Sequence, residues 1–212
     1  KRGLLVVLSG PAGSGKTTLA ERLVACTPGV VRSITATTRT PRANEVDGRD
    51  YHFLSRPEFA RRLAAGDFLE HAEFNGNLYG SLRSAVEKQR TAHATVLLVI
   101  DVQGGESLRR ACPDAVHVFV LPPTPESLRE RLRQRGTEDP ADMERRLTIA
   151  QEEIRCLPGY EYLVINDDPE QSVRDLLAIL RVAHDHRVQG GEPEAWLAGV
   201  FAGWHRRPSG IP

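Results

Sequence analysis

The sequence predicts an α/β fold in which helices cover both faces of a doubly wound parallel sheet. Strand-like apolar runs alternate with helix-forming stretches along most of the 212 residues. Residues 4–8, 95–100, 115–121 and 162–165 are mostly apolar and rich in β-branched side chains, which is typical of parallel strands buried on both faces. A glycine-rich turn joins the first of these runs directly to a helix, an arrangement typical of nucleotide-binding α/β folds.

This glycine-rich turn, GPAGSGKT, fits the pattern G-x-x-x-x-G-K-[ST], with a strand over 4–8 before it and a helix over 18–24 after it. Glycines let successive N–H groups turn toward one phosphate, and the helix adds the positive end of its dipole. Lys16 can reach the outer phosphates, and the Thr17 hydroxyl can hold Mg²⁺. A chance match is the alternative, but the strand–turn–helix context favours a nucleoside-triphosphate site. The predicted contacts are Gly10, Pro11, Ala12, Gly13, Ser14, Gly15, Lys16, Thr17 and Thr18.

The alternation of strands and helices is interrupted over residues 33–90. Turn signals there precede short mixed strands and a helix after Pro57, which predicts a small α+β insertion. Further helices are predicted from Pro125 to Gly136, from Pro140 or Asp142 toward Arg155, and after Pro169. We therefore expect one domain over 1–184, with a core of 1–32 and 91–184, an insertion over 33–90, a lid at about 136–147, and a C-terminal extension over 185–212.

The composition limits the possible functions. Basic and acidic residues balance at 28 each, so no basic excess supports binding to nucleic acid or to a membrane surface. The three cysteines, Cys26, Cys112 and Cys156, have no spacing typical of a disulfide framework or a metal site. No signal peptide or membrane span is visible, and a cytoplasmic enzyme is the expectation. The sequence leaves open whether it is a monomer or a homo-oligomer.

Asp101 follows the strand predicted over 96–100, where a carboxylate would face the crevice that holds the phosphates. This position favours a Walker B role, in which Asp101 binds Mg²⁺ beside the substrates. The alternative is a helix cap, because Gln103-Gly104-Gly105 and a helical stretch follow.

Arginines bracket the flexible-looking segment 136–140. Most of them are expected on a solvated helix face, paired with glutamates three or four residues away. We interpret Arg135 and Arg146 as functional residues that bring positive charge to a transferring phosphoryl group. The others are expected at the surface: Arg129, Arg131, Arg133 and Arg145.

A second arginine pair lies in the hydroxyl-rich stretch 35–42, and here the whole sequence becomes recognisable. The segments SITATTRTPRANEVDGRDYHFLS, FLEHAEFNGNLYGS, LLVIDVQG, RLRQRGTED…RRL and VINDD resemble the guanylate kinase family, in that order. With the P-loop, the resemblance covers nearly everything from Gly3 to Leu180. It implies a P-loop nucleoside-triphosphate-hydrolase-like core with a nucleoside-monophosphate-binding insertion and a lid. It also implies Mg²⁺-dependent, in-line transfer of the terminal phosphoryl group of ATP to GMP, and leaves the tolerance for dGMP open.

The resemblance assigns roles in the GMP site to this chain's own residues. Arg39 and Arg42 are expected to clamp the GMP phosphate, and the hydroxyl groups of Tyr51 and Tyr79 to support them. Glu70 is expected to read guanine, because a carboxylate accepts both the N1–H and the 2-amino group, whereas N1 of adenine is an acceptor. A surface carboxylate is the alternative for Glu70. The remaining contacts implied are Thr35 and Ser81 to the base, Asp101 beside the substrates, and Asn166 on the adenine side.

Two positions depart from the family's pattern. Val99 stands two residues before Asp101, where many members carry an acid, which puts any role of that acid in doubt here. Thr35 replaces the more usual serine and keeps the hydroxyl. Two other classes are alternatives: a ribose bisphosphate kinase, and a non-catalytic guanylate-kinase-like module that binds phosphopeptides. Glu70 argues against the first, and the intact Lys16 of the P-loop argues against the second.

Overall fold

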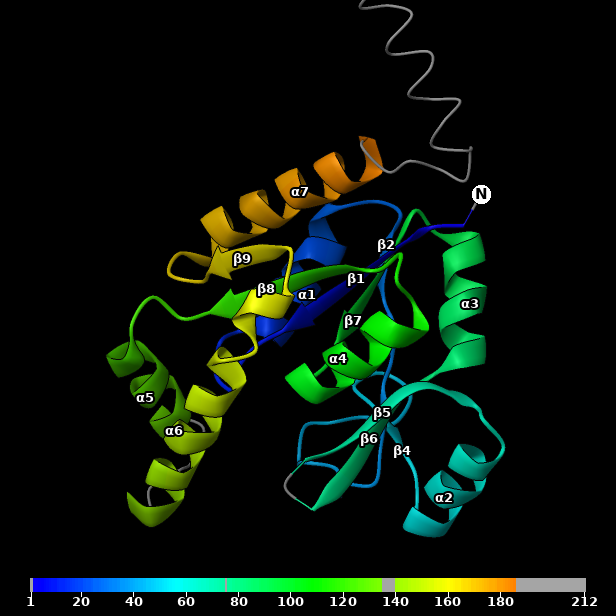
Figure 1. The fold of residues 1–212 in the computed structure, drawn as a ribbon, viewed down its shortest axis with the longest axis horizontal. Coiled ribbons are helices and arrows are strands. Elements are labelled where there is room, and N and C mark those ends of the chain that lie inside the picture. The colour runs from blue at the N-terminus through cyan, green and yellow to red at the C-terminus, as the bar shows by residue number, and fades with distance from the viewer. Residues whose placement is uncertain (1, 75, 135–139, 186–212) are drawn as a thin grey trace, which may run out of the picture.

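A five-stranded parallel sheet lies at the centre of the computed structural model, which describes residues 2–74, 76–134 and 140–185 (Figure 1). Every neighbouring pair of strands in this sheet runs parallel. The strand order is β2-β7-β1-β8-β9, with bounds Val30–Arg32, Thr95–Val99, Leu4–Ser9, Val116–Leu121 and Tyr162–Ile165. The predicted α/β fold with a parallel sheet is thereby confirmed. The three-residue strand β2 was not predicted.

Helices cover both faces of this sheet. On one face lie α1 (Lys16–Cys26) and α7 (Pro169–Asp185), which pack against alternate residues of β1. On the other face lie α3 (Arg83–Ala92) and α4 (Val102–Ala111), which pack against the intervening residues of β1. Because successive side chains of a strand point to opposite faces, two-sided burial requires an unbroken apolar run, as the sequence of β1 has.

A second, mixed sheet has the order β4-β3-β6-β5. Its strands are Ala36–Thr37 (β3), His52–Phe53 (β4), Phe68–Phe74 (β5) and Asn77–Leu82 (β6). Helix α2 (Arg56–Ala64) packs on it through Phe59, whose ring stacks on Phe68 at 4.3 Å between centroids. These elements all fall within residues 33–90, where the sequence predicts an α+β insertion.

Two further helices, α5 (Pro125–Gln134) and α6 (Pro140–Ile154), pack on each other through Leu128, Leu132 and Ala150. A 3₁₀ helix, Leu157–Gly159, then leads into β9. The predicted lid lies partly outside the described residues, as does nearly all of the predicted extension over 185–212. None of the helices described in the structure is long and apolar enough to span a membrane.

The topology brings distant segments to one edge of the parallel sheet. The carboxyl ends of β1, β7 and β9 are followed by the P-loop, by Asp101 and by Asn166, respectively. Parallel strands that are neighbours, or separated by one strand, end on the same side, so these three segments line one crevice. Figure 1 shows the second sheet on one side of this crevice and the α5–α6 pair on the other.

Candidate active site

Two adjoining cavities lie at this edge of the sheet. The inner cavity has a volume of about 200 Å³ and lies between the P-loop, the end of β7 and the second sheet. The lid-side cavity has a volume of about 490 Å³ and lies between the second sheet and helices α5 and α6. The inner cavity collects many of the residues predicted from the sequence: Gly10, Ala12, Gly13, Gly15, Lys16, Thr17, Thr35, Arg42, Tyr51, Glu70, Tyr79 and Asp101.

The P-loop conformation depends on glycine. Gly15 has a φ of 95°, and a Cβ there would lie 2.1 Å from the Asn166 Nδ2 atom. A Cβ at Gly10, with φ 136°, would lie 2.2 Å from the Val120 carbonyl oxygen. Lys16 begins α1, and its ammonium group donates to the carbonyl oxygens of Gly10 at 2.6 Å and Pro11 at 2.9 Å. The loop therefore holds the Lys16 ammonium group beside its backbone, where a bound phosphate would need a positive charge.

Hydrogen bonds from Asn166 and Arg131 hold the P-loop in place. The buried Asn166 donates through Nδ2 to the Ser14 carbonyl oxygen at 2.8 Å. Arg131 of α5 donates to the Asn166 carbonyl oxygen at 2.8 Å and to the Ser14 carbonyl oxygen at 3.4 Å. The prediction that Arg131 is an ordinary surface residue is therefore wrong. Its position among the other arginines of α5 gives no sign of these hydrogen bonds, because they join residues far apart in the sequence. Adenine contact by Asn166 stays a prediction.

Asp101 has the capping role that the sequence left as an alternative. It is the N-cap of α4, and its Oδ1 accepts from the Gly104 backbone N at 2.7 Å. Burial raises the pKa of this carboxyl, although the Gly104 amide and the Lys16 ammonium oppose the shift. Capping occupies one oxygen and orients the side chain at the rim of the inner cavity. The metal role of Asp101 stays a prediction.

The predicted guanine reader lies inside the protein. Glu70 on β5 is 3% exposed, which rules out the surface alternative, and it is paired in register with Ser81 on β6. The Ser81 hydroxyl donates to Glu70 Oε1 at 2.6 Å. Burial raises the pKa of Glu70 to about 7, and the nearby Asp101 carboxylate adds to the shift. Glu70 Oε2 lies so close to Gly104 that a Cβ there would come within 2.7 Å of it. Buried Thr35 also borders this cavity.

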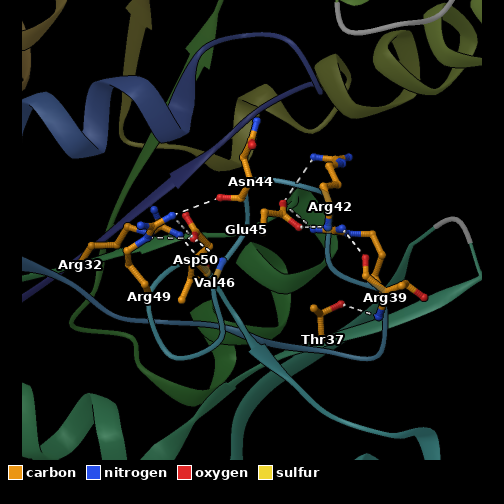
Figure 2. Close-up of polar contacts among 10 residues, drawn as sticks. Arg32, Thr37, Arg39, Arg42, Asn44, Glu45, Val46, Arg49 and Asp50 are labelled. Carbon is orange, nitrogen blue, oxygen red and sulfur yellow. Dashed lines mark hydrogen bonds and ion pairs between the residues drawn. The ribbon is translucent and has the colours of Figure 1, made fainter.

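The two predicted phosphate-clamp arginines share one carboxylate, as Figure 2 shows. Glu45 Oε1 accepts from Arg39 Nη2 at 2.8 Å and lies 3.7 Å from Arg42 Nη1, while Oε2 accepts from the Arg42 backbone N at 2.8 Å. Although burial opposes the shift, the bond to Glu45 raises the pKa of Arg39. The Arg39 guanidinium also lies 5.4 Å from the centre of the Tyr51 ring, and Tyr51 packs edge-on against Tyr79. Glu45 was not predicted from the sequence.

Glu153 is a second carboxylate that was not predicted from the sequence. It is 7% exposed near the end of α6 and borders both cavities. Burial raises its pKa and the Asp101 carboxylate adds to this, while the Lys16 ammonium and the Ala12 amide oppose it. Its spacing of seven from Arg146 puts both residues on one face of α6. Arg146 borders the lid-side cavity and pairs with Asp142 at 2.8 Å.

The remaining predicted residues take different places. Arg135 lies outside the described residues, so its role stays a prediction. Pro11 and Ser14 are buried within the loop, whereas Thr18 is exposed on the first turn of α1. In the part of the chain that the structure describes, no group of three or more His, Cys, Asp or Glu could hold a metal ion. Any ion at Thr17 and Asp101 would therefore take most of its ligands from a nucleotide and water.

Comparisons with known proteins point to one family. The family model described as guanylate kinase matches residues 2–183. A guanylate kinase of Symbiobacterium thermophilum is 46% identical over 190 residues, which cover 90% of each chain. A guanylate kinase of Thiobacillus denitrificans is 43% identical over 94% of this chain and 95% of its own. The crystal structure of guanylate kinase from Anaplasma phagocytophilum has a TM-score of 0.72 and 34% identity, and the match covers 88% of both chains.

Proposed function

Because the chain belongs to the guanylate kinase family, it transfers the terminal phosphoryl group of ATP to GMP, and we propose that the two adjoining cavities hold the reacting groups. The P-loop would cradle the triphosphate, and the second sheet would hold GMP. The observation that carries this assignment is the buried Glu70, which accepts from Ser81 and shares the inner cavity with Lys16. A cytoplasmic location is part of the same proposal.

Guanine recognition follows from the chemistry of Glu70. Its ionised carboxylate can accept hydrogen bonds from N1–H and from the 2-amino group at once. In a buried site, such bonds contribute strongly to affinity and to selection of the base. Adenine would place an acceptor against that carboxylate and leave it unpaired, at a cost of about 1–3 kcal/mol or more. The Ser81 hydroxyl already fixes one oxygen of the carboxylate, so the reader is oriented before the base arrives.

Phosphoryl transfer needs positioning and positive charge rather than a covalent enzyme intermediate. An oxygen of the GMP phosphate forms a bond to the terminal phosphorus of ATP. The bond from that phosphorus to the β-phosphate oxygen breaks, and its electron pair leaves with ADP. A nucleotide phosphate is already a nucleophile, so no general base is needed. Lys16 would stabilise the charge on the transferred group, and Arg39, Arg42 and Arg146 would hold and screen the two phosphates.

The residues at the P-loop fit a magnesium ion. The Thr17 hydroxyl borders the inner cavity, and Asp101 offers a carboxylate to the same cavity. Oxygen ligands in this number suit Mg²⁺, which binds proteins through one or two carboxylates together with substrate phosphates and water. When bound, the ion neutralises phosphate charge during transfer.

The test is ADP release, coupled to a spectroscopic assay, with ATP and Mg²⁺ and a panel of acceptors: GMP, dGMP, AMP, CMP, UMP and ribose 1,5-bisphosphate. We expect turnover on GMP, alone or with dGMP. Turnover on the sugar phosphate alone would refute the guanine reader while keeping the P-loop chemistry. No turnover on any acceptor by a folded protein that binds ATP would indicate a binding module.

A further inference from the structure

Glu153 is a buried carboxylate between the two cavities, and the reaction as described gives it no part. Its side chain lies in the last turns of α6 and reaches the P-loop. Within the described residues, its Oε2 atom has no hydrogen-bond partner. Burying a carboxylate oxygen without a partner costs free energy, so a purely structural role does not account for it.

The charges around Glu153 come from three elements. The Lys16 ammonium and the Ala12 amide of the P-loop favour the ionised carboxylate, and the Asp101 carboxylate after β7 disfavours it. On its own helix, Arg146 lies two turns earlier and borders the lid-side cavity. The carboxylates of Glu153 and Asp101 therefore both lie near the loop where a triphosphate would bind. The two carboxylates and the triphosphate are all negatively charged, so they would repel one another unless a further cation lay between them.

We propose that Glu153 is a positioning residue for the magnesium ion, accepting hydrogen bonds from water molecules that the ion retains. The inference rests on the metal site proposed above. Mg²⁺ dehydrates reluctantly and keeps several waters in most protein sites. A carboxylate that accepts from those waters fixes the ion without bonding to it, and such partners contribute strongly to metal affinity.

Val99 gives the inference a second basis in this chain. The side chain at this position is apolar and borders the inner cavity, two residues before Asp101. A valine there contributes no charge to this side of the cavity, so Asp101 is the one acid that the end of β7 supplies to it. Glu153 supplies a carboxylate to the same cavity from the opposite element, α6.

The test compares Glu153→Gln with a matched control, Glu152→Gln. Glu152 is the neighbouring residue, exposed and paired with Arg155, so its change alters charge without reaching the cavities. Mn²⁺ serves as the probe, because the electron paramagnetic resonance signal of free Mn²⁺ reports its affinity for the enzyme–ADP complex without turnover. ADP affinity is measured in parallel by calorimetry, with Mg²⁺ in excess and with EDTA. Thermal unfolding confirms that each variant is folded.

We expect Glu153→Gln to weaken Mn²⁺ binding about tenfold, to weaken ADP binding in Mg²⁺ and to leave ADP binding in EDTA unchanged. Glu152→Gln should match the wild type in all three. Equal losses of ADP affinity with and without metal would overturn the inference, because Glu153 would then act on the P-loop itself. Wild-type Mn²⁺ affinity in Glu153→Gln would overturn it too. Metal-independent ADP binding by the wild type would instead refute the proposed metal site.

A second variant tests the compensation directly. Adding Val99→Glu to Glu153→Gln returns a carboxylate to the inner cavity from β7. We expect this double variant to recover most of the lost Mn²⁺ affinity. A double variant that binds Mn²⁺ no better than Glu153→Gln alone would show that the two positions do not act on the same ion.

Discussion

Replacing Glu70 with glutamine should stabilise the empty protein while it weakens GMP binding. Burial raises the pKa of Glu70 from its ordinary value of 4.5 to about 7, so the folded protein holds this proton more tightly than the unfolded chain. Between these two values, the free energy of unfolding of the wild type falls as the pH rises. The full loss corresponds to about 3 kcal/mol by pH 8, at 1.36 kcal/mol per pKa unit. The glutamine side chain does not titrate, so the free energy of unfolding of the variant has no such dependence on pH at this position.

The assay is urea unfolding of the wild type and Glu70→Gln at pH 5, 6, 7 and 8. We expect the difference in unfolding free energy to grow by about 2.5 kcal/mol in favour of the variant between pH 5 and pH 8. Carboxyls away from the inner cavity titrate equally in both proteins and cancel in the difference. The Ser81 hydroxyl can still donate to the amide oxygen of glutamine, so that hydrogen bond is retained. A difference that stays flat across this pH range would refute the reasoning.

The same titration should govern substrate binding with the opposite sign. GMP needs the ionised carboxylate, so wild-type affinity for GMP should rise about tenfold from pH 6 to pH 8. Glu70→Gln should lose roughly 10- to 150-fold in affinity at pH 8, which is the 1.5–3 kcal/mol of a hydrogen bond to a charged group. The variant also provides the control for titration of the GMP phosphate. A wild-type pH profile no steeper than that of the variant would contradict the assignment of Glu70.

Three further variants test the rest of the site. Lys16→Met should lower kcat at least 100-fold with an unchanged circular dichroism spectrum, and substantial turnover by the folded variant would remove Lys16 from the mechanism. Glu45→Gln should raise the KM for GMP about tenfold with little change in that for ATP, since the shared carboxylate aligns Arg39 and Arg42; equal effects on both substrates would indicate a general loss of structure. Arg131→Ala should weaken ADP binding about tenfold in calorimetry by releasing the back of the P-loop, and wild-type affinity would show that Asn166 alone suffices.

Much of this site could be predicted because many of its residues belong to short, contiguous sequence motifs. The P-loop is contiguous, and its strand and helix are short-range features, so the position of Lys16 followed directly. Glu70 and Ser81 are eleven residues apart, but an antiparallel pair brings them into register, as the family's motifs imply. Glu153 and Arg131 could not be found this way. Their role depends on how α5 and α6 pack against the loop, and in sequence each resembles one more charge on an amphipathic helix.

Glu45 was missed for a different reason. An acid three residues after Arg42 reads as an ordinary local ion pair, and only the fold of residues 39–45 shows that one carboxylate also reaches Arg39. Asp101 shows the converse case. Its two interpretations, a helix cap and a magnesium ligand, are compatible with each other. One of its oxygens caps α4, and the cap itself sets where the side chain lies.

The start of α4 lies between the two proposed substrate sites. The Gly104 amide donates to Asp101 Oδ1, while the Gly104 backbone lies against Glu70 Oε2, and the Asp101 carboxylate raises the pKa of Glu70. A cation that pairs with Asp101 would relieve this repulsion and favour the ionised, guanine-binding form of Glu70. Thermodynamic reciprocity then requires GMP to strengthen binding at the other site by the same factor. The two substrates should therefore bind cooperatively, with no movement of the backbone needed to communicate between them.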